Sequence, residues 1–226
     1  MKKLLVATFG ISLFAAAVPA RADLINFTGV GPHASVVSIA TSAGSESVWA
    51  GELNWDWITP AGGGSFYTYC ADVMNFLNDP QYVIQKTTND MADPIRGAKA
   101  AWLFNTYAES IRTSADTTYN DNRAAALQVA IWEILTDATP DLGMGSFKLL
   151  TTGTINDLAK GFLLDLAGAA YQGSVAAWLD SYSTDPSRPG QDQITRVPEP
   201  ATLLLLGVGG VALARNRRRA ARTQIS

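Results

Sequence analysis

The chain has 226 residues, of which 47% are hydrophobic and 16% are charged, and its formal net charge is −3. This length suits one domain once the two ends are removed, and the charged fraction lies below the roughly 25% of soluble domains. No basic surface dominates the composition, which argues against nucleic acid as a partner.

The first 22 residues have the three parts of a secretory signal peptide. A basic start and an apolar stretch precede Ala20-Arg21-Ala22, which fits the small-x-small pattern of a cleavage site. A retained membrane anchor is the alternative, but the apolar run is short for a span. We therefore expect a signal peptidase to remove residues 1–22, so that the mature protein begins at Asp23 outside the cytoplasm.

The region that follows predicts strands. Residues 23 to about 60 alternate Val, Ile and Trp with Ser, Thr and Glu, and glycines mark the turns. The stretch FYTYCADVMNFL at 66–77 is rich in aromatic and β-branched residues and predicts a buried strand. On such a strand Cys70, the only cysteine of the chain, shares a face with Asp72.

Three helical patterns come next, over 94–111, 123–137 and 157–182. Strands followed by helices indicate an α+β class. We expect a domain over 23–190 in which an N-terminal β-sheet or sandwich portion precedes a helical subdomain. Residues 191–196 are open between a linker and a last strand.

Gln128 lies in an unusual place for a polar residue. At 100° per residue, Ala124, Leu127 and Ile131 form an apolar stripe on the second helix, and Gln128 falls inside it, whereas Glu133 points to the opposite face. The amide is therefore predicted to enter the core, where an unpaired amide costs ~1–3 kcal/mol. A glutamine hydrogen-bonded to backbone is the simplest interpretation.

The C-terminus combines a short motif, an apolar run and a basic cluster. The 14 residues of 201–214 would span roughly 21 Å as a helix, against a hydrocarbon core of ~30 Å, and a basic tail continues over 220–226. The segment 197–219 resembles the PEP-CTERM sorting signal of Gram-negative bacteria that make extracellular polymer. The residues that carry this resemblance are Pro198, Glu199, Pro200, Arg215, Arg217, Arg218 and Arg219.

That resemblance implies how the protein travels. An exosortase would cleave near the Pro-Glu-Pro sequence after export across the inner membrane, with 201–214 as a transient transmembrane sorting helix. The protein would then reach the cell surface or the extracellular matrix.

The middle of the chain resembles the thioester domain of bacterial surface proteins. Tyr69-Cys70 followed by an acidic residue matches one motif of that family, and LQVAIWEI at 127–134 matches the other. KAAWLFNTY at 99–107 resembles the helix between these motifs, so the likeness covers about 65–137. The resemblance implies an internal thioester between Cys70 and Gln128.

A thioester defines the expected chemistry. The thiol attacks the amide carbonyl and expels ammonia, and a later amine on a surface protein or matrix polymer attacks the thioester. Tyr69 and Trp132 are expected to pack around the bond or donate to it, and Asp72 to accept a proton, orient a donor or make a structural hydrogen bond. Such a single-use reaction is not turnover, so we expect no enzyme, no catalytic residues and no cofactor.

Other classes have less support in the sequence. His33, the only histidine, is expected on a surface loop, which argues against a cysteine hydrolase and most zinc sites. The main alternative is a passive exopolysaccharide-associated structural or binding module with an unreacted, buried Cys70. Trp49, Trp55 and Trp57 would serve sugar stacking there, although alternating strands favour core or half-buried positions for them.

Overall fold

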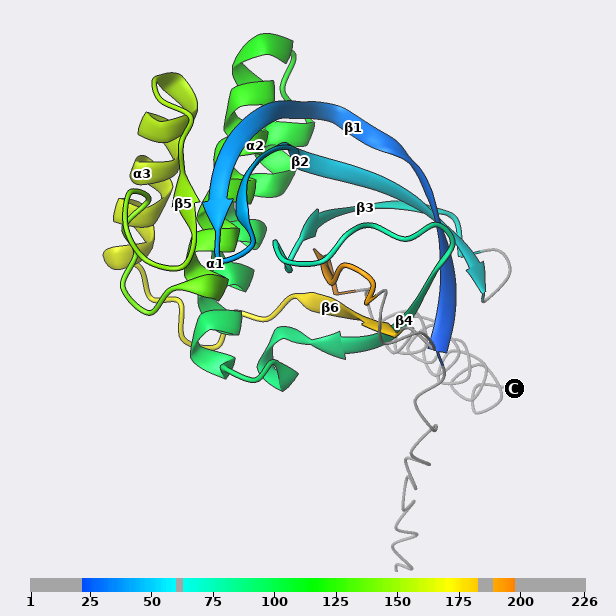
Figure 1. Cartoon of the computed structure of the whole chain (residues 1–226). Coiled ribbons are helices and arrows are strands. Elements are labelled where there is room, and N and C mark those ends of the chain that lie inside the picture. Colours follow the sequence, from blue (N-terminus) through cyan, green and yellow to red (C-terminus); the bar gives the residue numbers. More distant parts are fainter. Residues whose placement is uncertain (1–21, 60–62, 183–188, 198–226) are drawn as a thin grey trace, which may run out of the picture.

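The structure is a computed structural model that describes residues 22–59, 63–182 and 189–197. The predicted β-rich N-terminal region forms a long antiparallel hairpin of β1 (Ala22–Thr41) and β2 (Gly44–Thr59), joined by a two-residue turn. Apolar and polar residues alternate along both strands, which suits strands with one face in the core. The two strands arch from the helices to the far end of the sheet (Figure 1).

The arch depends on a glycine and on breaks in the register. The pairing of β1 with β2 shifts between Phe27 and Gly29 and again between Val30 and Ala34. Opposite the second shift, Gly51 has a φ of 136°, and a Cβ there would lie 2.6 Å from the carbonyl oxygen of His33. Only glycine allows this backbone conformation and this close approach of the two strands.

Six of the described strands form one closed antiparallel sheet. Its order is β2-β3-β7-β6-β4-β1, and the pairing of β1 with β2 closes the ring. A two-residue strand, β5, pairs antiparallel with Ile39 and Ala40 at the end of β1. The bounds of the shorter strands are β3 (Ser65–Cys70), β4 (Gln81–Thr87), β5 (Lys148–Leu149), β6 (Ala177–Tyr182) and β7 (Gln193–Thr195).

Within the described chain, three α-helices lie between β4 and β6 in the sequence. They are α1 (Pro94–Arg112), α2 (Thr117–Thr136) and α3 (Thr154–Ala167), preceded by a short 3₁₀ helix, η1 (Thr88–Asp90). Asp93 and Asp116 accept hydrogen bonds from the first turns of α1 and α2, which fixes where these helices begin. The helices gather at one end of the sheet, and α2 contacts β1, β2, α1 and α3 (Figure 1).

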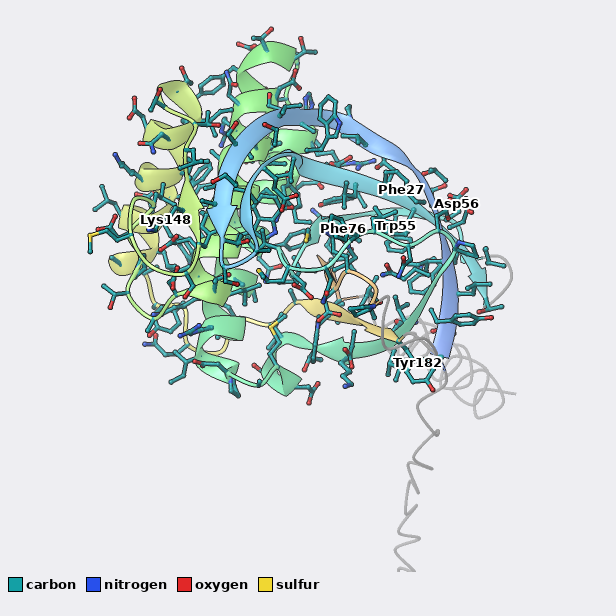
Figure 2. The ribbon with its side chains drawn as sticks, in the orientation of Figure 1. Phe27, Trp55, Asp56, Phe76, Lys148 and Tyr182 are labelled. Carbon is teal, nitrogen blue, oxygen red and sulfur yellow. The ribbon has the colours of Figure 1, made fainter. Side chains whose placement is uncertain are left out.

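The described residues form two apolar clusters. The larger lies between the helices and the ends of β1, β2 and β3 and includes Tyr69, Cys70 and Leu127. The smaller fills the interior of the closed sheet around Trp55 and Leu53, and Figure 2 shows Trp55 in the space that the strands enclose. Cys70 and α2 therefore meet where the helical layer covers one end of the closed sheet.

The predicted α+β class, with a sheet or sandwich portion before a helical subdomain, is wrong. The strands β6 and β7 follow the helices in sequence and complete the sheet that β1–β4 begin. The helix expected over 157–182 ends at Ala167, and β6 occupies its last six residues. Closure pairs both edges of the sheet, which an open sheet would leave unpaired.

The C-terminal transmembrane sorting helix is not part of the observed fold. The segment 201–214 lies outside the described residues, as do the signal peptide residues 1–21. No helix in the described portion is long and apolar enough to cross a membrane.

Candidate functional site

Cys70 is the last residue of β3 and is 2% exposed. Its backbone pairs with Gln193 of β7, whereas the pairing of β3 with β2 reaches only to Thr68. The sequence prediction that it lies on a buried strand is correct. The same strand was expected to continue to residue 77, but β3 ends at Cys70 itself.

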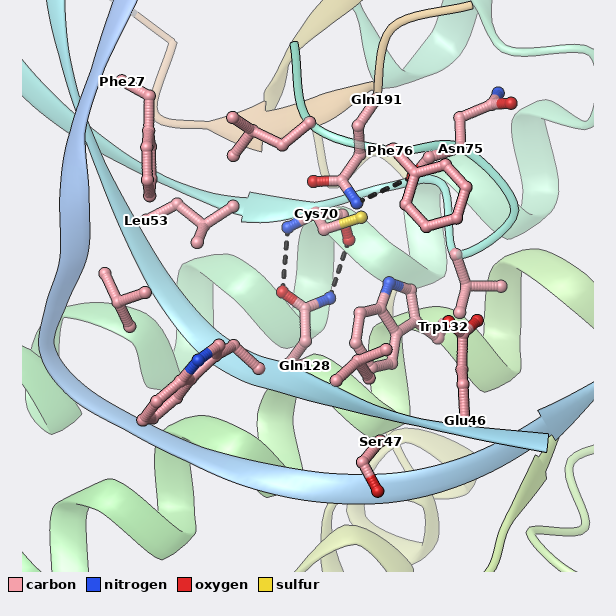
Figure 3. A pocket seen from close by; sticks show the side chains of 16 residues that line it. Phe27, Glu46, Ser47, Leu53, Cys70, Asn75, Phe76, Gln128, Trp132 and Gln191 are labelled. Atoms are coloured by element: carbon pink, nitrogen blue, oxygen red, sulfur yellow. Dashed lines mark hydrogen bonds between the residues drawn. The ribbon is translucent and has the colours of Figure 1, made fainter. Parts of the chain in front are cut away.

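Gln128 of α2 enters the core as predicted and is 1% exposed. Its amide is paired to the backbone of Cys70 at two points (Figure 3). The Cys70 backbone N–H donates to Gln128 Oε1 over 2.8 Å, and Gln128 Nε2 donates to the Cys70 carbonyl oxygen over 2.7 Å. The side-chain carbonyl of Gln128 is thereby held against the residue that carries the only thiol.

The thiol makes its own contacts with the loop that follows. Cys70 Sγ donates to the carbonyl oxygen of Asp72 over 3.0 Å, and the Asp72 backbone N–H donates to Sγ over 3.3 Å. Burial raises the pKa of Cys70 far above its ordinary value, and the Asp72 charge adds to this, so the group is a neutral thiol at neutral pH.

Trp132 lies one turn beyond Gln128 on α2. Figure 3 shows its indole nitrogen on the side that faces the sulfur of Cys70. The indole N–H makes no hydrogen bond to a described residue. Because it lies near the sulfur, it lowers the pKa of Cys70, but burial raises that pKa by more. The indole N–H of Trp132 is thus free to donate a hydrogen bond to negative charge that develops on the sulfur.

The other two expected supporting residues have different surroundings. Asp72 lies in the loop after β3, not on the strand, and its carboxylate accepts from the Met74 backbone N–H and from Asn75 Nδ2. Tyr69 is fully buried with its ring against Phe104 of α1, at 6.0 Å between ring centroids. Asp72 organises the loop, and Tyr69 packs β3 against α1.

A pocket of about 430 Å³ opens beside the pair. Cys70, Gln128 and Trp132 lie at one part of its wall, and residues 46–49 of β2 lie at another (Figure 3). The loop after β3 contributes Val73, Asn75, Phe76 and Leu77. This volume falls in the range of small-molecule sites, ~300–1,000 Å³. A small nucleophile therefore has room next to Gln128.

Sequence reasoning missed a buried polar chain that supports this loop. Trp55 Nε1 donates to Thr68 Oγ1 over 2.9 Å, and Thr68 Oγ1 donates to Gln193 Oε1 over 2.8 Å. Gln193 Nε2 in turn donates to Gln191 Oε1, and Gln191 Nε2 donates to the Asn75 carbonyl oxygen over 3.1 Å. The two glutamines of QDQ at 191–193 were the available signal: Gln193 begins β7 and is buried, and Gln191 lies just before the strand and is partly buried.

His33 was expected on a surface loop, and this is wrong. It lies within β1, is 4% exposed, and its Nδ1 is 3.0 Å from Asp121 Oδ1 at the start of α2. The ring is covered because β1 continues without interruption under α2. Its partner is therefore the carboxylate of Asp121. Across the residues that the structure describes, no group of three or more His, Cys, Asp or Glu side chains is arranged to hold a metal ion.

The comparisons with known proteins bear on the C-terminus. Residues 196–219 match the PEP-CTERM protein-sorting motif, which covers the segment identified in the sequence at 197–219. No curated protein and no solved structure matches the chain. Most of the motif, including Pro198 to Pro200 and the arginines, lies outside the described residues. The motif implies an exported protein that is recognised by an exosortase and sorted at a membrane.

Proposed function

We propose that Cys70 and Gln128 form an internal thioester, through which this exosortase-sorted protein attaches covalently to amines at the cell surface or in the extracellular matrix. The observation that carries the proposal is the two-point pairing of the Gln128 amide with the Cys70 backbone, at 2.8 and 2.7 Å. It holds an acyl group against the residue that bears the nucleophile.

The pairing suits the attack of sulfur on the amide. The Cys70 N–H already donates to Gln128 Oε1, the oxygen that becomes negative when the carbonyl carbon turns tetrahedral. A donor fixed in this position stabilises such charge by about 3–4 kcal/mol in well-studied enzymes. Holding both partners in one orientation contributes a further ~7–11 kcal/mol to similar reactions.

The step balances without a co-reactant. Sγ bonds to the Cδ atom of Gln128, the Cδ–Nε2 bond breaks, and the thiol proton leaves with Nε2 as ammonia. To begin, Sγ exchanges its contact with the Asp72 carbonyl oxygen for the carbonyl carbon of Gln128. Because burial strongly disfavours a thiolate at this site, the proton leaves Sγ as the sulfur attacks Cδ, and no free thiolate precedes the step.

The second step is the attachment. A neutral primary amine attacks Cδ, the C–S bond breaks, and the proton released by the nitrogen returns to Cys70 as a thiol. The product is an amide between Gln128 and the target. The protein is consumed once, so this proposal makes it a covalent adhesin and not an enzyme.

Intact mass of the exported protein tests the proposal. We expect the native protein to be lighter by one ammonia, and the deficit to disappear in Cys70→Ala. Methylamine should add to Gln128 and release one free thiol. A native protein of full mass that gains nothing from methylamine would contradict the thioester.

A passive module associated with exopolysaccharide is the second candidate, and the exposure of Trp49 favours it. Trp55 is buried and Trp57 is half-buried, as alternation predicted, but Trp49 is 59% exposed beside the pocket, where an indole can stack on a sugar ring. In that case Gln128 stays an amide and its hydrogen bonds are purely structural. Full mass, together with uptake of a thiol reagent by Cys70, would favour this candidate.

A further inference from the structure

The pocket beside Cys70 and Gln128 has an uneven chemical character. Most of its wall is apolar, including Leu53, Val73 and Phe76. Of the described residues that line it, Glu46 is the only one with a formal charge. Glu46 is exposed on β2, and Figure 3 shows its side chain extending toward the part of the pocket where Trp132 lies. One carboxylate thus lies on the wall of a mostly apolar pocket.

The outer wall of the pocket is held in place despite its exposure. Phe76 is 77% exposed, yet it forms a backbone bridge with Gly190, and its neighbour Asn75 accepts from Gln191 Nε2. Trp49 of β2 also lines the pocket and is 59% exposed. Two large aromatic side chains on the pocket wall, Phe76 and Trp49, are therefore exposed to solvent.

On the basis of the proposed thioester, we propose that this pocket selects its nucleophile: a primary amine that is cationic in solution and carries an unbranched alkyl stem. Glu46 is the residue that recognises the charge, and Phe76 and Trp49 contact the stem. The carboxylate raises the local concentration of the ammonium form. The ammonium then gives one proton to water, and the neutral nitrogen attacks Cδ of Gln128 as described above.

The test compares two nucleophiles on the exported protein that shows the ammonia deficit. n-Butylamine is cationic at neutral pH, whereas hydroxylamine is uncharged there. We expect Glu46→Gln to slow the butylamine adduct roughly two- to fivefold at low salt, the size of an exposed ion-pair interaction, and to leave hydroxylamine unchanged. The difference should fade at high salt, because the Debye length shortens to about 3 Å at 1 M. Asp157→Asn on α3, which makes the same charge change away from the pocket, should have no effect.

The stem is tested with the ratio of butylamine to methylamine rates. Because each buried methylene contributes about fourfold, we expect the wild type to favour butylamine and Phe76→Ala to lower the ratio roughly threefold. Leu164→Ala on α3 removes an apolar side chain of similar exposure, 73%, and should leave the ratio unchanged.

The outcomes separate this inference from the thioester itself. Equal slowing of both nucleophiles by Glu46→Gln, or slowing of neither, overturns the role of Glu46 while hydroxylamine still reports an intact thioester. A protein that forms no hydroxylamine adduct at all overturns the thioester and this inference together.

Discussion

At the scale of single residues, Glu133 is a carboxylic acid buried in the core, where charged side chains are rarely found. It is fully buried on α2, next to Trp132, and its Oε1 accepts from the Asp141 backbone N–H over 2.7 Å. Its Oε2 has no hydrogen-bond partner among the described residues. Burial raises the pKa of Glu133 to about 7, and the charges of Asp137 and Asp141 add to the rise.

This pKa predicts a loss of stability as pH rises. Below the ordinary glutamic acid pKa of 4.5 both states hold the proton; above it the unfolded state ionises first, so stability falls until pH passes about 7. Glu133→Gln removes this dependence and keeps an acceptor for Asp141. We expect the unfolding free energy of the wild type, relative to Glu133→Gln, to fall by on the order of 2 kcal/mol between pH 5 and pH 8.

Urea unfolding at the two pH values measures this difference. Asp192, whose pKa burial raises to about 6, is present in both proteins and cancels in the comparison. A difference between the two proteins that does not change with pH would show that Glu133 titrates normally.

The sequence placed Gln128 in the core and Glu133 on the opposite face of the helix, and the structure buries both side chains for a physical reason. Periodicity separates a buried from an exposed face only when a helix has one. Residues 124–134 of α2 are all buried, because α1, α3 and the β1–β2 hairpin surround the helix. A central helix such as α2 can therefore bury polar residues on more than one face. Their hydrogen-bond partners, which the sequence does not show, distinguish their roles.

At the scale of elements, α1 and η1 lie in very close contact. A Cβ on Gly97, in the first turns of α1, would lie 2.0 Å from the carbonyl oxygen of Thr88. Thr88 is itself fixed, since its backbone N–H donates to the Ala176 carbonyl oxygen over 3.0 Å. This contact joins the first helix to the connection that leads from α3 into β6.

Gly97→Ala is therefore expected to destabilise the protein by about 1–3 kcal/mol through overpacking, although alanine favours helices. Gly161→Ala in α3 is the matched control, because its Cβ would meet nothing within 4 Å. That change should stabilise by ~0.5–1 kcal/mol from helix propensity alone. Thermal unfolding of both variants checks the pair, and equal shifts in the same direction would contradict the close contact.

Strand elements were predicted unevenly for a related reason. The β1–β2 hairpin was visible in the sequence because its alternation runs over many residues. The six residues of β6 directly follow an Ala- and Gly-rich stretch after α3 and were assigned to that helix. Their strand character depends on pairing with β4, some 95 residues earlier by the partners Ile84 and Asp180, which local sequence cannot show.

At the scale of the whole molecule, the last strand adjoins the sorting signal. The strand β7 closes the ring between β3 and β6 and ends at Thr195, and the PEP-CTERM match begins at residue 196. Thr195 Oγ1 donates to the Tyr67 carbonyl oxygen over 2.7 Å, and Gln193 pairs with Cys70. The strand that pairs with Cys70 is thus the one that directly precedes the sorting motif.

Cleavage within the motif would leave β7 on the protein. A chain that ends at Val197 keeps the closed sheet, and we expect it to unfold in one cooperative transition. A chain that ends at Gly190 loses both strand pairings of β7, the Thr68–Gln193 hydrogen bond and the Asp192 contacts to Ser181 and Trp178. The loss opens two sheet edges and leaves several buried polar groups unpaired. Each unpaired group costs about 1–3 kcal/mol, and their sum exceeds the free energy of unfolding of an ordinary domain.

Near-ultraviolet circular dichroism and limited proteolysis of the two chains measure the result. Equal protease resistance would show that the sheet does not need its closing strand, and that cleavage upstream of the motif is compatible with the fold.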